Sequence, residues 1–149
     1  HLLTALAAFC QEQDSSLTVL ESPSWAVARQ CAAEMEQPDR HAIGFVAGER
    51  YGVLAIERPS LTLPVATLQA FLDRYLADQP GARLDYIHGE DTLEQLGAQP
   101  GNIGFHLPAL AKDDFFRTII RDGALPRKTF SMGEADEKRF YLECRRIVP

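Results

Sequence analysis

The sequence predicts an α/β (α+β) domain in which a mixed β-sheet with one hairpin packs against several helices. Segments with apolar residues at helical spacing alternate with segments at strand spacing along the 149 residues. Two strand-like runs, residues 42–46 and 51–56, flank the turn 47–50, which contains Gly as hairpin turns commonly do. No internal repeat, low-complexity tract or linker-like stretch divides the chain, so residues 1–149 are expected to form a single domain.

Two helices and a short strand are predicted in the first third of the chain, around the start of the hairpin. Residues 2–10 carry apolar side chains at helical spacing, and residues 17–20 form a strand-like run. Ser22 is the expected N-cap of the next helix, because Pro23 then occupies the first helical position. The apolar stripe of this helix consists of Val27, Ala28, Cys31, Ala32 and Met35.

After the hairpin, two further helices and a strand are predicted. Pro64 is expected to open a helix that Pro80 ends. Residues 84–88 form a strand-like run. Asp91 and Glu94 have the spacing of a capping box, which predicts a short helix through residue 96.

The last third of the chain is predicted to hold one more strand and one more helix. Residues 102–107 form a strand-like run, and a helix is expected to begin at 112 or 113 and to end at Gly123 as its C-terminal cap. The segment 132–147 fits a helix, because a capping-box spacing precedes it, but its apolar residues also alternate as in a strand. Both alternatives stay open.

Composition and charge exclude several classes of protein. Fifteen basic residues against 21 acidic ones leave a net charge of −6, which argues against a nucleic-acid partner. No apolar run approaches the roughly 20 residues of a membrane span, so no membrane partner is expected. The three cysteines, Cys10, Cys31 and Cys144, form no CxxC pair and are odd in number. We therefore expect free, buried thiols in a cytoplasmic protein.

Sequence motifs for known chemistry are missing. The chain contains no Walker loop, GxGxxG, GxSxG or HExxH motif, and its four histidines lie far apart. Neither a metal nor a cofactor is therefore expected. A candidate pocket is predicted at His88 and Glu90, because His88 ends a predicted strand and Gly89 permits close approach of a ligand. The alternative is that His88 only caps this strand. His106 is expected to be a partly buried, hydrogen-bonded side chain of its strand.

The strongest candidate site in the sequence is an anion-binding turn near the C-terminus. Arg127 and Lys128 supply cationic donors, Thr129 and Ser131 supply hydroxyls, and Gly133 permits close approach of the backbone to a ligand. If Ser131 caps a helix, free backbone N–H groups add to the positive potential. These groups suit a small anionic ligand such as phosphate. The alternative is a knot of salt bridges with nearby acidic side chains.

The same region resembles a known family. The segments KDDFFRT at 112–118, RDGALPRKTFSMGEA at 121–135 and EKRFYLE at 137–143 resemble the end of the bacterial family called domain of unknown function 1015. YIHGED at 86–91 matches a preceding motif of that family, as do the GF and LP pairs on either side of His106. The resemblance is dense over 84–147. His106 departs from the family, in which an aliphatic residue is expected.

The resemblance implies that this chain is the C-terminal domain of a longer protein, whose N-terminal domain would be its partner. In the family, that N-terminal part carries a motif that makes it similar to a fold to which free-serine kinases also belong. This motif does not occur in the present sequence. Two functions are therefore open. The first is a packing or assembly module that is not catalytic in isolation. The second is a phosphate-binding part of the pocket of a small-molecule phosphotransferase-like enzyme, formed by the anion-binding turn with His88 nearby.

Overall fold

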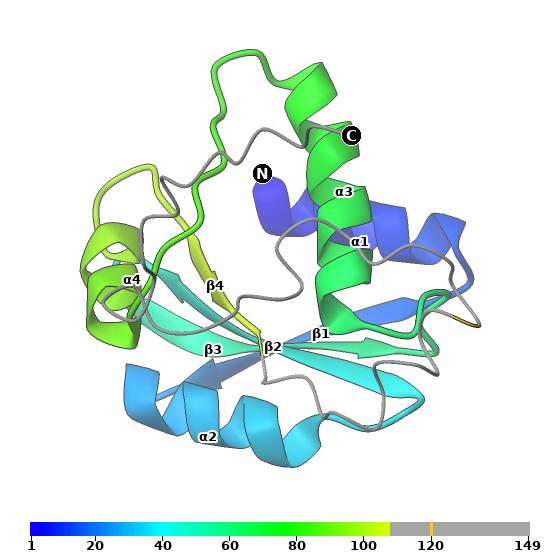
Figure 1. Cartoon of the computed structure of the whole chain (residues 1–149), viewed down its shortest axis with the longest axis horizontal. Helices are drawn as coiled ribbons and strands as arrows, with labels where there is room; N and C mark the ends of the chain where they lie inside the picture. Colours follow the sequence, from blue (N-terminus) through cyan, green and yellow to red (C-terminus); the bar gives the residue numbers. More distant parts are fainter. Residues whose placement is uncertain (108–119, 121–149) are drawn as a thin grey trace, which may run out of the picture.

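The computed structural model describes residues 1–107 and residue 120, and within them it forms four helices and a four-stranded antiparallel sheet (Figure 1). The predicted α+β class is confirmed. The helices are α1 (Leu2–Glu12), α2 (Trp25–Met35), α3 (Pro64–Asp78) and α4 (Glu90–Gly97). The strands are β1 (Ser16–Ser22), β2 (Arg40–Ala47), β3 (Arg50–Glu57) and β4 (Gly104–His106).

The strand order is β1-β3-β2-β4, so β1 and the three-residue β4 are the edges of the sheet among the described residues. All three pairings in this part of the chain are antiparallel, where the sequence predicted a mixed sheet. The predicted hairpin is confirmed as β2 and β3. Its turn is shorter than predicted, because Ala47 already pairs with Arg50 and leaves only two residues between the strands.

Helices cover both faces of the sheet. Figure 1 shows α1 and α3 on one face and α2 on the other. The strand period of two assigns the side chains of β2 and β3 to these faces in turn. Toward α1 and α3 point Ile43, Phe45, Leu54 and Ile56, which form the main apolar cluster with Leu6, Phe9, Cys10, Leu68, Phe71 and Leu72. Toward α2 point the smaller residues Ala42, Val46 and Val53.

Gly52 allows the largest fully buried side chain, Phe45, to lie against the neighbouring strand. Gly52 pairs with Phe45, and a Cβ atom built on Gly52 would lie 2.7 Å from Cε1 of Phe45 and 2.2 Å from the carbonyl oxygen of Leu20. Both distances are shorter than any van der Waals contact that a Cβ atom makes. The absence of a side chain at Gly52 is therefore a packing requirement of the sheet.

A partly buried carboxylate accepts a backbone hydrogen bond from β2. Glu36, the C-cap of α2, accepts a hydrogen bond from the backbone N–H of Ala42 at 2.6 Å through Oε2. Its Oε1 lies 3.4 Å from Nδ1 of the fully buried His41, whose Nε2 lies 3.0 Å from the carbonyl oxygen of Leu61. Strand β4 pairs only with residues 44–46 of β2, so Glu36 acts in place of a strand partner at Ala42.

The predicted start of α2 was wrong. Ser22 was expected to cap the helix, but it pairs with Tyr51 as the last residue of β1. The N-cap is Ser24, whose Oγ accepts from the backbone N–H of Val27 at 3.4 Å. The strand ladder therefore extends over Ser22, and Pro23 precedes the helix instead of occupying its first position.

Two further local predictions were wrong. Residues 84–88 form no strand, and Tyr86 of this segment instead donates a hydrogen bond to Gln69 of α3 at 2.9 Å. The short helix after this segment exists as α4, but its N-cap is Gly89 and not Asp91. Asp91 lies in the first turn, where its negative charge interacts favourably with the positive end of the helix dipole.

The remaining sequence predictions are confirmed in part or fall outside the described residues. The helix opened by Pro64 and the strand within 102–107 are present as α3 and β4. The predicted helix from 112 or 113 and the segment 132–147 lie outside the described residues, apart from Ile120. Within the described residues no helix is long and apolar enough to span a membrane.

Candidate functional site

Of the two residues predicted to line a pocket, the structure places only Glu90 in a defined cluster. His88 is exposed in the irregular segment before α4, so it does not end a strand. Glu90 is the first residue of α4 and forms an ion pair with Arg29 of α2. Its Oε1 also lies 3.5 Å from Nε2 of His106 in β4. Three elements thus meet at this carboxylate.

Trp25 completes this group, which we call the Arg29 cluster: Trp25, Arg29, Glu90 and His106. The guanidinium carbon of Arg29 lies 5.9 Å from the centre of the Trp25 ring, and the His106 ring meets the same indole edge-on at 5.9 Å. The cluster packs directly on β2, because a Cβ built on Gly44 would be in ordinary van der Waals contact with Cβ of His106 at 3.4 Å and with the indole of Trp25 at 3.7 Å. The cluster therefore connects α2, α4 and β4 through side-chain contacts.

The Arg29 cluster is held by an ion pair and by ring contacts, not by a closed hydrogen-bond network. Trp25 Nε1, Arg29 Nε and His106 Nδ1 are buried and have no hydrogen-bond partner among the described residues. Within the same residues no group of three or more His, Cys, Asp or Glu side chains has metal-binding geometry. The geometry of the cluster is that of a structural contact between elements.

His106 gives the cluster a dependence on pH. Burial lowers the pKa of His106, and the positive charge of Arg29 lowers it further. The unfolded chain then binds a proton more readily than the folded chain as the pH falls through about 6.5, the ordinary His value. Stability is therefore complete above that pH and decreases below it.

Below about pH 6.5 we expect the free energy of unfolding to fall more steeply in the native chain than in the variant His106→Phe, which keeps an aromatic ring against Trp25. Urea denaturation at several pH values measures both slopes. The difference between the two slopes isolates the contribution of His106, because all other titrating groups are common to both proteins. Parallel pH profiles would contradict the inferred role of His106.

The predicted anion-binding turn falls outside the described residues. This applies to Arg127, Lys128, Thr129, Ser131 and Gly133, and also to Cys144. The anion site therefore stays a prediction. The other two cysteines, Cys10 and Cys31, are free as predicted. Cys10 is buried, and its burial raises the pKa of the thiol, whereas Cys31 is only partly buried.

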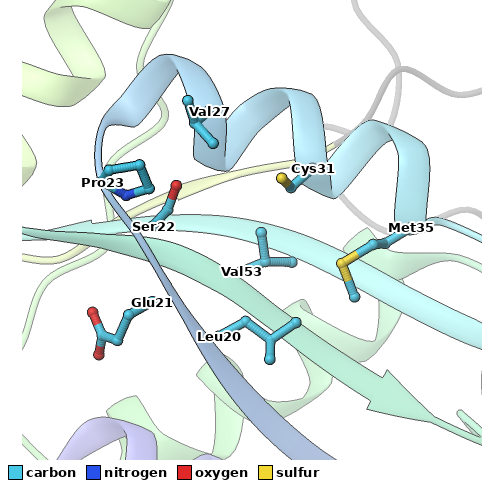
Figure 2. A pocket seen from close by; sticks show the side chains of 8 residues that line it. All are labelled: Leu20, Glu21, Ser22, Pro23, Val27, Cys31, Met35 and Val53. Carbon is cyan, nitrogen blue, oxygen red and sulfur yellow. The ribbon is translucent and has the colours of Figure 1, made fainter.

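An apolar hollow between β1 and α2 is the second feature of the described residues, and sequence reasoning missed it. Its volume is about 340 Å³. Figure 2 shows Val27, Cys31 and Met35 of α2 above it and Leu20 of β1 and Val53 of β3 below. Glu21, Ser22 and Pro23 close one end, and the Glu21 side chain points away from α2. We call the full set of eight residues the β1–α2 hollow.

The hollow exists because α2 contacts the sheet through small residues. Ala28 and Ala32 are fully buried, whereas the larger side chains one position away, Val27 and Cys31, are not. The sequence predicted that all four belong to one apolar stripe of the helix. The residue sizes could have predicted this difference in burial. The row of alanines permits close contact with the sheet, and the row of larger residues beside it then lies over β1.

Comparison with protein-family models, with curated proteins and with solved structures finds no match for this chain. The resemblance of segments 84–147 to a family therefore stays a prediction, as does the N-terminal partner domain that the resemblance implies.

Proposed function

We propose that this chain is a packing and assembly module, not catalytic in isolation, that docks through β1 and the β1–α2 hollow on the rest of a longer protein. One observation carries the proposal: an apolar hollow lies directly beside an edge strand. Leu20 and Val27 on its two walls are 39% and 40% exposed. An apolar hollow beside an exposed strand is a place where apolar side chains of another segment can be buried.

The edge strand itself lacks most of the features that usually prevent association. Natural edge strands are protected by Lys, Pro, bulges or very short length. β1 is seven residues long, contains no Lys or Pro, and pairs with β3 in an uninterrupted register. The single charge in β1, on Glu21, forms an ion pair with Arg50. The surface is therefore close to neutral, although the whole chain has a net charge of −6.

Chemistry at the hollow also favours binding over catalysis. Its one carboxylate, Glu21, is held by Arg50 and points away from α2, so the hollow has no carboxylate free to act as a general base. The remaining lining is apolar apart from the Ser22 hydroxyl and the Cys31 thiol. Such a lining supports the burial of apolar groups of a partner.

Cys31 provides a direct test, because it lines the hollow while Cys10 is buried elsewhere. We expect a maleimide to alkylate Cys31 about tenfold more slowly in the longer protein than in the 149-residue chain, a ratio that corresponds to about 1.4 kcal/mol of protection. Mass spectrometry of the cysteine peptides measures the two rates. Cys10 serves as an internal reference.

Two matched substitutions on α2 make the test specific. Val27→Lys places a charge at the hollow, and we expect it to restore fast alkylation in the longer protein. Ala33→Lys adds the same charge on an exposed position of α2 that does not line the hollow, and the slow rate is expected to persist. Equal Cys31 rates in the chain and in the longer protein would contradict the proposed function.

A further inference from the structure

We propose that the group docking at the β1–α2 hollow is an extended, uncharged segment that adds to β1 as a fifth strand and inserts alternate apolar side chains beneath α2. This inference rests on the proposed function and specifies the chemistry of the partner. Strand addition draws affinity from main-chain hydrogen bonds and selectivity from pockets for alternate side chains. Both parts are present at β1.

The main-chain part comes from the free side of β1. Every residue of β1 from Ser16 to Ser22 is paired with β3, and no described strand lies on the other side. In an antiparallel ladder the N–H and C=O groups of alternate residues point to opposite sides of the strand. About half of the backbone groups of β1 therefore point away from β3, in the direction of an added strand.

The side-chain part comes from the position of α2. Its small residues Ala28 and Ala32 lie against the sheet, and its larger row of Val27, Cys31 and Met35 overhangs the hollow beside β1. Neighbouring strands lie about 4.8 Å apart. A strand added to β1 would thus direct every second side chain toward this row, on the same face as Leu20. On the opposite face it would meet Val19, which is 37% exposed.

The chemistry of the hollow selects an uncharged apolar segment. Its volume of about 340 Å³ is at the small end of ligand pockets, which suits one or two aliphatic or aromatic side chains. Because Arg50 neutralises Glu21, a charged partner would find no counter-charge in β1. A helix in the same place would leave the free backbone groups of β1 without partners. A second copy of the chain would bring together two molecules of net charge −6, which disfavours self-association.

A peptide of alternating Thr and Val, matched to the seven residues of β1 and capped at both ends, is a suitable probe. It is titrated into the isotopically labelled 149-residue chain and followed by the amide and methyl signals of β1 and α2. We expect shifts at Val19, Leu20 and Val27 and slower hydrogen exchange at alternate amides of β1. The same peptide with every amide N-methylated keeps its apolar side chains but forms no ladder, and we expect it to bind about tenfold more weakly or worse.

Control variants and alternative outcomes separate this inference from the proposed function. Val27→Lys is expected to abolish binding of the unmodified peptide, and Ala33→Lys to leave it unchanged. If both peptides bind equally, the hollow takes apolar groups without strand pairing, so strand addition is wrong while the proposed docking function stands. If neither binds, strand addition is wrong, and the Cys31 rates decide the proposed function independently. A dimer with protected β1 amides, detected by light scattering and exchange, would identify the occupant as a second copy and would overturn the inference.

Discussion

Phe45→Ala is expected to lower the free energy of unfolding by about 3–5 kcal/mol, the largest effect of any substitution considered, because a buried aromatic ring is lost and the cavity cannot close. Phe45 is fully buried in the cluster formed with α1 and α3. Its partner across the ladder is Gly52, which has no side chain to fill the space. Urea denaturation measures the loss. Val19→Ala, at a half-exposed position of β1, is the control and is expected to cost less than about 1 kcal/mol.

The contact between Phe45 and Gly52 is tested by combining substitutions. Gly52→Ala alone forces its Cβ against the Phe45 ring and the Leu20 carbonyl, so it is expected to cost about 1–3 kcal/mol. In the Phe45→Ala background the ring contact is gone and only the carbonyl contact remains, so the same substitution is expected to cost less. Strict additivity of the two losses would show that the ring does not constrain Gly52.

Glu36→Ala is expected to lower the free energy of unfolding by about 2–4 kcal/mol, because a buried polar group left without its partner costs about 1–3 kcal/mol and two groups are affected. These are the backbone N–H of Ala42 and the ring of His41, both fully buried. Glu36→Gln keeps an oxygen that accepts from Ala42, and a smaller loss is expected.

Glu34→Ala is the matched control for this prediction. Glu34 lies on the same helix, but its hydrogen bond with Gln30 is exposed to solvent. Its loss is expected to stay within about 0.5 kcal/mol, as for most surface substitutions. Chemical denaturation of the three variants at one pH gives the comparison. A loss at Glu36 no larger than that at Glu34 would show that the edge of β2 does not depend on this carboxylate.

Local patterns predicted most of the fold. The hairpin, the helix opened by Pro64 and the short helix before β4 follow from spacing and turn residues that lie close together in the sequence. The strand predicted at 84–88 failed because an alternating pattern does not show whether the segment pairs with a sheet, and Tyr86 of this segment instead donates a hydrogen bond to Gln69 of α3. Ser22 failed as a cap because the ladder with β3 extends further than local spacing indicates.

The candidate sites were harder to predict, because they depend on contacts between distant segments. Glu90 was singled out for its position after a predicted strand, but its partner Arg29 lies 61 residues away and no local pattern links the two. His106 is partly buried as expected, but its Nδ1 lacks the expected hydrogen-bond partner among the described residues, and its contacts with Trp25 and Glu90 depend on the place of β4 in the sheet. The hollow depends on how closely α2 approaches the sheet, which is a three-dimensional property.

Amide hydrogen exchange along β1 tests the central claim, that this strand and the hollow beside it form a docking surface. In the 149-residue chain, alternate amides of β1 that point away from β3 are expected to exchange quickly, while the amides of β3, which pairs on both sides, exchange slowly. In the longer protein the fast amides of β1 are expected to slow about tenfold or more, corresponding to at least about 1.4 kcal/mol of protection. Equal exchange of β1 in the two proteins would contradict the account.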